Sequence, residues 1–171
     1  CTLPVGEGAA QPVVLTVGGQ VSNTLSLSYD PPVITGLAPA SGPTSGGSLT
    51  IDGANFGALG IFDATVTVGG VSCPVTSATH ITIVCTAPPG VGVDLPVIVT
   101  LAGQSSAPAL FDHLPPAITS IAPDNGPMAG GVALTLTGTN FGAAGATVTV
   151  GGSACPVLSQ GHTSATCTLP A

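Results

Sequence analysis

An internal repeat constrains this chain of 171 residues more than any other feature of its sequence. Residues 1–32 align without a gap on residues 85–116, and at residue 117 the front of the same unit begins again. The period of about 82 to 84 residues is longer than most solenoid repeats and close to the size of a small β-sandwich. We therefore predict one complete domain at 33–116. It is flanked by the C-terminal half of a repeat at 1–32 and the N-terminal part of another at 117–171.

Pairs of prolines fall at the predicted repeat boundaries, at 31–32 and 115–116. Proline fixes the backbone angle φ, so such a joint has little conformational freedom. The pattern predicts short, stiff connections between domains arranged in series.

The short-range pattern predicts an all-β fold. Apolar residues stand two apart with Thr or Ser between them, which is typical of strands that bury one face. The chain also holds 25 Gly and 17 Pro, many of them in Gly-Gly, Gly-Pro and Pro-Pro pairs that mark turns. No apolar set recurs at helical spacing over a useful length. The clearest alternating pairs are Leu49 and Ile51, Val66 and Val68, Ile81 and Ile83, and Val97 and Val99.

The charge composition excludes two classes of partner. The chain has no Lys or Arg and a formal charge of −7. It therefore lacks the cations that neutralise phosphates in nucleic acids or that dock a protein on anionic membranes. Mean hydropathy is high at +0.65, but no apolar run approaches the roughly 18 residues of a membrane-spanning helix. We expect no nucleic-acid partner and no membrane span in this sequence.

The sequence contains an ordered series of motifs: Ile34-x-x-Leu-x-Pro39, Gly42-Pro-x-x-Gly-Gly47, Leu49-Thr-Ile51, Gly53-x-Asn-Phe-Gly57, Val66-Thr-Val-Gly-Gly70, Cys73 and Cys85-x-x-Pro88. This series resembles one known family, the IPT/TIG domain. The resemblance covers 33–116 and both flanking partial copies, and it implies an immunoglobulin-like β-sandwich of the early-set type. The family occurs in receptor ectodomains, in secreted surface proteins and as accessory domains of carbohydrate-active enzymes. It therefore implies a scaffold or adhesion role and supplies no active site.

The repeat also organises the five cysteines. The spacing from Cys73 to Cys85 is the same as the spacing from Cys155 to Cys167. We predict one disulfide within each pair, Cys73 with Cys85 and Cys155 with Cys167. Cys1 occupies the second position of a pair, so its expected partner lies outside these residues or in a neighbouring subunit. Disulfides persist in oxidising compartments, which predicts a secreted, extracellular or cell-surface protein.

The sequence offers no catalytic, cofactor-binding or metal site. No Cys-x-x-Cys pair is present for zinc, and no Gly-x-Ser-x-Gly elbow for a serine nucleophile. Asp52 and Asp63 have no counterparts in the second copy, which argues against a repeated carboxylate site. His80 and His162 hold equivalent positions, and we interpret them as exposed polar residues at turns instead of metal or proton sites. We expect the chain not to be an enzyme and to need no cofactor.

Of all parts of the sequence, the Asn-Phe-Gly strings at 55–57 and 140–142 most resemble functional-site motifs. A structural interpretation explains them better. Phe supplies bulk to a core poor in aromatics, while Asn and Gly tolerate the left-handed backbone angles of a turn.

We predict a structural or adhesive segment of a long extracellular tandem-repeat protein that forms a surface fibre, stalk or filament. Its expected partners are copies of itself, with glycans, O-linked or as ligands, as a further class. Two arrangements remain open: a covalent array in which the chain continues, or subunits that complete each other's domains. The alternative functions are a carbohydrate-binding accessory module of a secreted enzyme and a receptor-type ectodomain.

Overall fold

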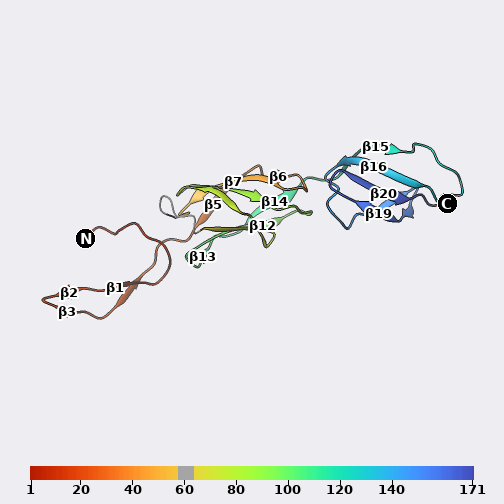
Figure 1. Cartoon of the computed structure of the whole chain (residues 1–171). Coiled ribbons are helices and arrows are strands. Elements are labelled where there is room, and N and C mark those ends of the chain that lie inside the picture. The colour runs from red at the N-terminus through yellow and green to blue at the C-terminus, as the bar shows by residue number, and fades with distance from the viewer. Residues whose placement is uncertain (58–63) are drawn as a thin grey trace. The chain divides into compact units, whose positions relative to one another are not determined.

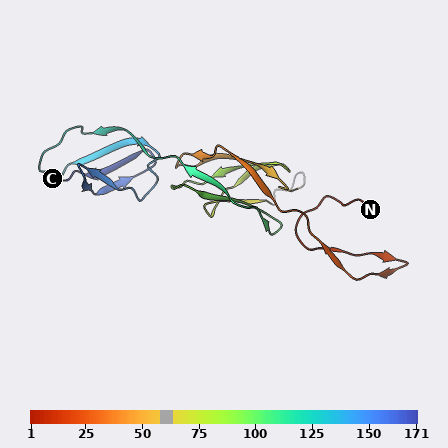
Figure 2. The same cartoon turned by 180° about the vertical axis from the view of Figure 1, so that it is seen from behind.

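The computed structural model describes residues 1–57 and 64–171, so Asp63 lies outside the described residues. Every regular element among them is a β-strand, which confirms the all-β prediction (Figures 1 and 2). The chain divides into two compact units: Cys1–Ala40, Ser48–Ala87 and Leu95–Phe111 form the first, and Ser41–Gly47, Pro88–Asp94 and Asp112–Ala171 form the second. Compact units need not coincide with repeats, and the repeat boundaries stay a prediction from the sequence.

Two sheets build the sandwich of the central repeat. The first has the strand order β10 (Val75–Ala78), β11 (Thr82–Ala87), β7 (Gly47–Ala54) and β5 (Val33–Ala38). The second has the order β6 (Ser41–Gly42), β14 (Ala109–His113), β12 (Leu95–Leu101), β8 (Thr65–Val68) and β9 (Val71–Ser72), and β13 (Gln104–Ser105) also pairs with β12.

Burial alternates along these strands as the sequence pattern predicts, so each sheet turns one apolar face inward. The first sheet contributes Leu49, Ile51 and Ile83 to the core, and each of these side chains is fully buried. The second sheet contributes residues such as Val97 and Val99 to the same core. A single apolar layer between two sheets defines a β-sandwich.

A disulfide joins the two sheets. Cys73 directly follows β9, Cys85 lies in β11, and the two are disulfide-bonded. In the second unit, Cys155 at the end of β18 (Ser153–Cys155) is bonded in the same way to Cys167 in β20 (Ser164–Thr168). Both pairs are those expected from the repeat. Cys1 is exposed and not disulfide-bonded.

Residues 1–32 reproduce the pairing of the second sheet in a smaller form. Strand β1 (Gln11–Val13) pairs with β4 (Leu25–Leu27), and β2 (Thr16–Val17) pairs with β3 (Gln20–Val21). In the alignment of 1–32 on 85–116, the paired residues Val13 and Leu25 correspond to Val97 and Ala109, which are partners between β12 and β14. The repeat in sequence is thus a repeat in strand register.

The residues after 116 reproduce the first sheet. Strands β15 (Ala117–Ala122), β16 (Ala133–Thr139), β20 and β19 (Val157–Gln160) form a sheet in that order, the counterpart of β5, β7, β11 and β10. A separate pair joins β17 (Val148–Val150) to β18. The apolar cluster here is smaller, with Leu134, Leu136 and the disulfide at its centre.

Candidate functional site

The two Asn-Phe-Gly strings adopt the same conformation. Asn55 and Asn140 have φ angles of 62° and 60°, and the glycine that follows two residues later also has a positive φ in each case. Phe56 is buried in the central core, and Phe141 packs against the smaller one. The structural interpretation of these strings from sequence is therefore confirmed.

A glycine two residues before each asparagine makes room for the aromatic ring. A Cβ atom on Gly53 would clash with the ring of Phe56 and with the carbonyl oxygen of Val33. The same holds for Gly138 with Phe141 and Ala117. The motif Gly-x-Asn-Phe-Gly thus describes one local fold in which the ring lies directly on the strand backbone.

The side chain of each asparagine binds the Pro-Pro segment that precedes its repeat. Asn55 Nδ2 donates a hydrogen bond to the carbonyl oxygen of Pro31 at 3.1 Å, within the first unit. Asn140 Nδ2 donates to the carbonyl oxygen of Pro115 at 3.3 Å, within the second unit. We call these two Asn–Pro contacts the linker clamps. Sequence analysis did not predict them, although the similar distance from Pro-Pro to Asn in both copies was a signal.

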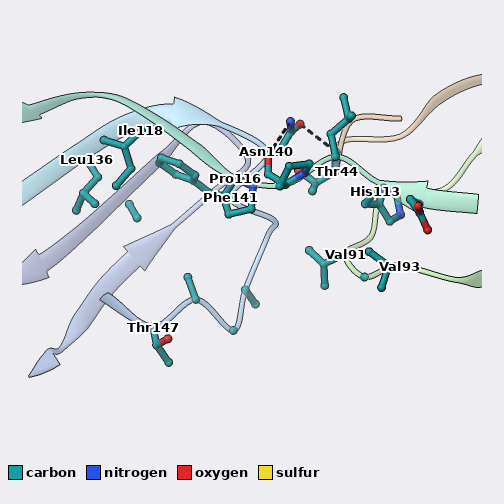
Figure 3. A pocket seen from close by; sticks show the side chains of 18 of the residues that line it. Thr44, Val91, Val93, His113, Pro116, Ile118, Leu136, Asn140, Phe141 and Thr147 are labelled. Atoms are coloured by element: carbon teal, nitrogen blue, oxygen red, sulfur yellow. Dashed lines mark hydrogen bonds between the residues drawn. The ribbon is translucent and has the colours of Figure 1, made fainter. Parts of the chain in front are cut away.

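Thr44 extends the clamp of the second unit (Figure 3). Its backbone N–H donates to Asn140 Oδ1 at 3.4 Å, and its hydroxyl lies 3.0 Å from His162 Nδ1. Thr44 is only 2% exposed, so these polar groups are satisfied within the protein. Asn140 therefore uses both ends of its amide, one on Pro115 and one on Thr44.

The histidines take structural positions beside the clamps. His80 is exposed, as predicted, and its Nδ1 lies 3.2 Å from the carbonyl oxygen of Gly57. His162 is half-buried beside Thr44, so the prediction that it is an exposed residue is wrong. His113, for which sequence analysis proposed no role, is buried with its Nδ1 3.2 Å from the carbonyl oxygen of Pro43.

A pocket of about 900 Å³ lies in the second unit next to Asn140. Figure 3 shows that its wall is largely apolar, with Val91, Val93, Ile118 and Leu136 among the side chains that line it. The Asp112 carboxylate beside it accepts a hydrogen bond from the Asp94 backbone at 2.7 Å.

Metal-binding clusters and membrane-spanning helices are both absent from residues 1–57 and 64–171. Within these ranges no group of three or more His, Cys, Asp or Glu side chains is placed to hold a metal ion. Nor do these residues include a helix long and apolar enough to cross a membrane.

We expect the Asn140→Asp variant to lower the free energy of unfolding by about 1–2 kcal/mol, the cost of losing one hydrogen bond of this kind. Aspartate keeps the acceptor for Thr44 but has no donor for the Pro115 carbonyl. Urea unfolding followed by circular dichroism measures the change. The same substitution at exposed Asn23 is the control, and equal stability of both variants would show that the clamp does not stabilise the fold.

The fold defines a class of protein, a tandem array of β-sandwich repeats. The IPT/TIG domain model matches residues 32–113 and 116–171, so the chain belongs to the IPT/TIG domain family. This match confirms the immunoglobulin-like sandwich inferred from the motifs.

The chain is also similar to parts of longer proteins. Human fibrocystin-L is 29% identical over 99% of this chain, which spans only 4% of that protein. The structure of the plexin A4 full extracellular region is 27% identical, with a TM-score of 0.44 over 82% of this chain and 15% of that one. The structure of SGBP-B from a complex xyloglucan utilization locus in Bacteroides uniformis is 23% identical, with a TM-score of 0.36 over 81% of this chain and 42% of that one. At these TM-scores, the two structural likenesses carry no functional argument.

Proposed function

We propose that this chain is a structural segment of an extracellular tandem-repeat protein, built to hold successive IPT/TIG domains in series along a fibre, stalk or filament. One observation carries the proposal: a linker clamp is present at both Pro-Pro segments. In each, the asparagine has the same backbone conformation, and the carbonyl of the first proline of the pair accepts the hydrogen bond. A joint that is only a tether needs no such contact. Proline rigidity and a side-chain hydrogen bond together reduce the freedom of the joint.

The location outside the cell is proposed from the disulfides. Each of the two sandwich repeats that contains a cysteine pair has it oxidised. Structural disulfides are rare in reducing compartments. The chain has no Lys or Arg, so it also offers no cleavage site to trypsin-like proteases.

We propose that the segment has no catalytic role. The titratable side chains at the pocket, Asp112 and His113, both make hydrogen bonds to the backbone of the fold. Carbohydrate binding is the alternative function, and it usually relies on several aromatic side chains that form a flat platform. Among the residues that line the pocket, Phe141 alone is a Phe, Tyr or Trp, which gives this alternative little support.

Electron microscopy of the full-length protein after rotary shadowing tests the proposed function. We expect rods in which neighbouring domains keep a narrow range of angles, and wider angles when Asn55 and Asn140 are both changed to Asp. Freely jointed beads in the unaltered protein would contradict the role of the clamps. Strong, saturable binding on a glycan array would favour the carbohydrate-binding alternative.

A further inference from the structure

Asp30 is the one aspartate in the sequence that a proline follows, and the pair lies at the first Pro-Pro joint. Strand β4 ends at Leu27 and β5 begins at Val33, so the Asp30–Pro31 peptide bond belongs to no strand. Acid breaks an Asp–Pro bond more easily than other peptide bonds. The aspartate carboxylate can attack its own carbonyl carbon, and the tertiary amide nitrogen of proline leaves readily once it is protonated.

The side chain of Asp30 is not held away from that carbonyl. Asp30 is exposed, and within residues 1–57 and 64–171 no hydrogen bond or ion pair engages its carboxylate. By contrast, the Asp52 carboxylate accepts a hydrogen bond from Thr82 at 3.2 Å. An unengaged carboxylate can rotate about its side-chain bonds toward its own backbone.

Two hydrogen bonds hold the chain on both sides of the reacting carbonyl. Gln104 Nε2 donates to the carbonyl oxygen of Tyr29 at 3.1 Å, and Asn55 Nδ2 donates to that of Pro31 at 3.1 Å. The Asp30 carbonyl between them accepts no hydrogen bond from the part of the chain that the structure describes. The joint thus fixes the neighbours of this carbonyl and leaves the carbonyl itself open to attack.

The second joint shows the same exposure at the end of a complete repeat. Leu114 is the counterpart of Asp30 and directly precedes the second Pro-Pro pair, and its side chain is 40% exposed. Asn140 holds the Pro115 carbonyl there. The position before a Pro-Pro pair is therefore accessible to water in the complete central repeat as well.

We propose that the Asp30–Pro31 bond is an acid-triggered self-cleavage site. A carboxylate oxygen of Asp30 bonds to the carbonyl carbon of the same residue, and the bond from that carbon to the Pro31 nitrogen breaks. The product is a cyclic anhydride, and the nitrogen leaves as a secondary amine that carries the proton supplied by the acid. Water then opens the anhydride, so the net reaction is hydrolysis of one peptide bond into fragments 1–30 and 31–171.

The titratable neighbours of Asp30 do not block this reaction. Glu7, Tyr29 and His80 line the same pocket of about 240 Å³ in the first unit. Tyr29 and His80 both hydrogen-bond to backbone carbonyl oxygens instead of to the Asp30 carboxylate. The chain has no Lys or Arg that could hold this carboxylate in an ion pair. Acid and water are therefore the only further reactants that the cleavage needs.

Cleavage at this bond divides the chain between two repeats. Fragment 31–171 keeps every strand of the central sandwich and the disulfide between Cys73 and Cys85. It should therefore keep its fold after the chain is cut. An acidic environment would shorten an array by whole repeats, and this role is independent of the proposed function.

Acid incubation of the chain followed by mass spectrometry tests the proposal. The incubation uses the most acidic pH at which the circular dichroism spectrum still matches that of the neutral chain, so that the fold is retained. We expect fragments 1–30 and 31–171 to accumulate at a rate similar to that in urea at the same pH, and not to form at neutral pH. Cleavage in urea alone, or earlier cleavage at another bond, would overturn the proposal.

Substitution of Asp30 tests the attacking group. Asp30→Glu keeps the charge but requires a larger anhydride ring, and it should slow cleavage about tenfold or more, because intramolecular attack depends strongly on geometry. Asp124→Glu makes the same change at an exposed aspartate that no proline follows, and it should leave the rate unchanged. Equal rates in Asp30→Glu and in the unaltered chain would show that this carboxylate is not the nucleophile.

The second joint offers a gain-of-function test. Leu114→Asp places an aspartate before Pro115, and we expect a new acid fragment that begins at Pro115 and forms at a rate similar to that at the first joint. A Leu114→Asp chain that acid cuts only after Asp30 would contradict the claim that the joints leave this bond open. None of these failures affects the linker clamps or the proposed function.

Discussion

Replacing Phe56 with Ala is expected to lower the free energy of unfolding of the central sandwich by about 3–5 kcal/mol, the usual cost of deleting a buried phenylalanine ring. Phe56 is 2% exposed and lies in the larger of the two apolar clusters formed by residues 1–57 and 64–171. Its ring lies so close to Gly53 that a Cβ atom there would clash with it, so the substitution leaves a cavity against the strand backbone. Urea unfolding followed by circular dichroism measures the loss.

Two further variants serve as controls for this measurement. Leu110→Ala removes an exposed side chain from β14, and its effect should stay within about 0.5 kcal/mol. Phe141→Ala should cost less than Phe56→Ala, because Phe141 is only half-buried in the smaller cluster. Equal losses at Phe56 and Leu110 would contradict the packing described for the Asn-Phe-Gly fold.

The second large effect concerns the disulfide between Cys73 and Cys85. Changing both residues to Ala should cost about 3 kcal/mol, the value of the loop-entropy model for a closed loop of this size. Cys1→Ser is the matched control and should change stability little, since Cys1 is exposed and not disulfide-bonded. Urea unfolding of the double variant in the absence of reductant gives the value.

Force spectroscopy provides a second measure of the same bond. The cysteines are 12 residues apart and their Cα atoms lie 5.6 Å apart. Since an extended chain spans about 3.5 Å per residue, reduction should lengthen the unfolded repeat by roughly 35 Å. An unfolding step of unchanged length after reduction would show that no disulfide closes this loop.

The fold was largely predictable because its signals are local or repeated. Alternation at Leu49 and Ile51 identified a strand with one buried face, and the structure buries both residues fully. The equal spacing of the two cysteine pairs indicated their partners, which the structure bonds in the same way. Five cysteines alone allow many pairings, so the repeat was needed to show which cysteines are partners.

The linker clamps could not be predicted in the same way. The hydrogen bond from Asn140 to Pro115 joins positions far apart in the chain, and nothing in the local pattern shows where an asparagine side chain will point. A left-handed turn is by itself a sufficient reason for asparagine at this position, so the sequence gives no sign of a second role. Burial of Thr44 and His113 depends on contacts with distant groups, which composition and alternation do not report.

The central claim is that each repeat is a disulfide-stapled sandwich of an extracellular fibre, and counting free thiols in the protein from its native source tests it most directly. The protein is denatured in an alkylating agent, with and without reductant, and this segment is analysed by mass spectrometry after digestion with pepsin, because trypsin has no site in it. We predict that Cys73, Cys85, Cys155 and Cys167 are alkylated only after reduction. Alkylation of these four cysteines without reductant would contradict both the staple and the extracellular location.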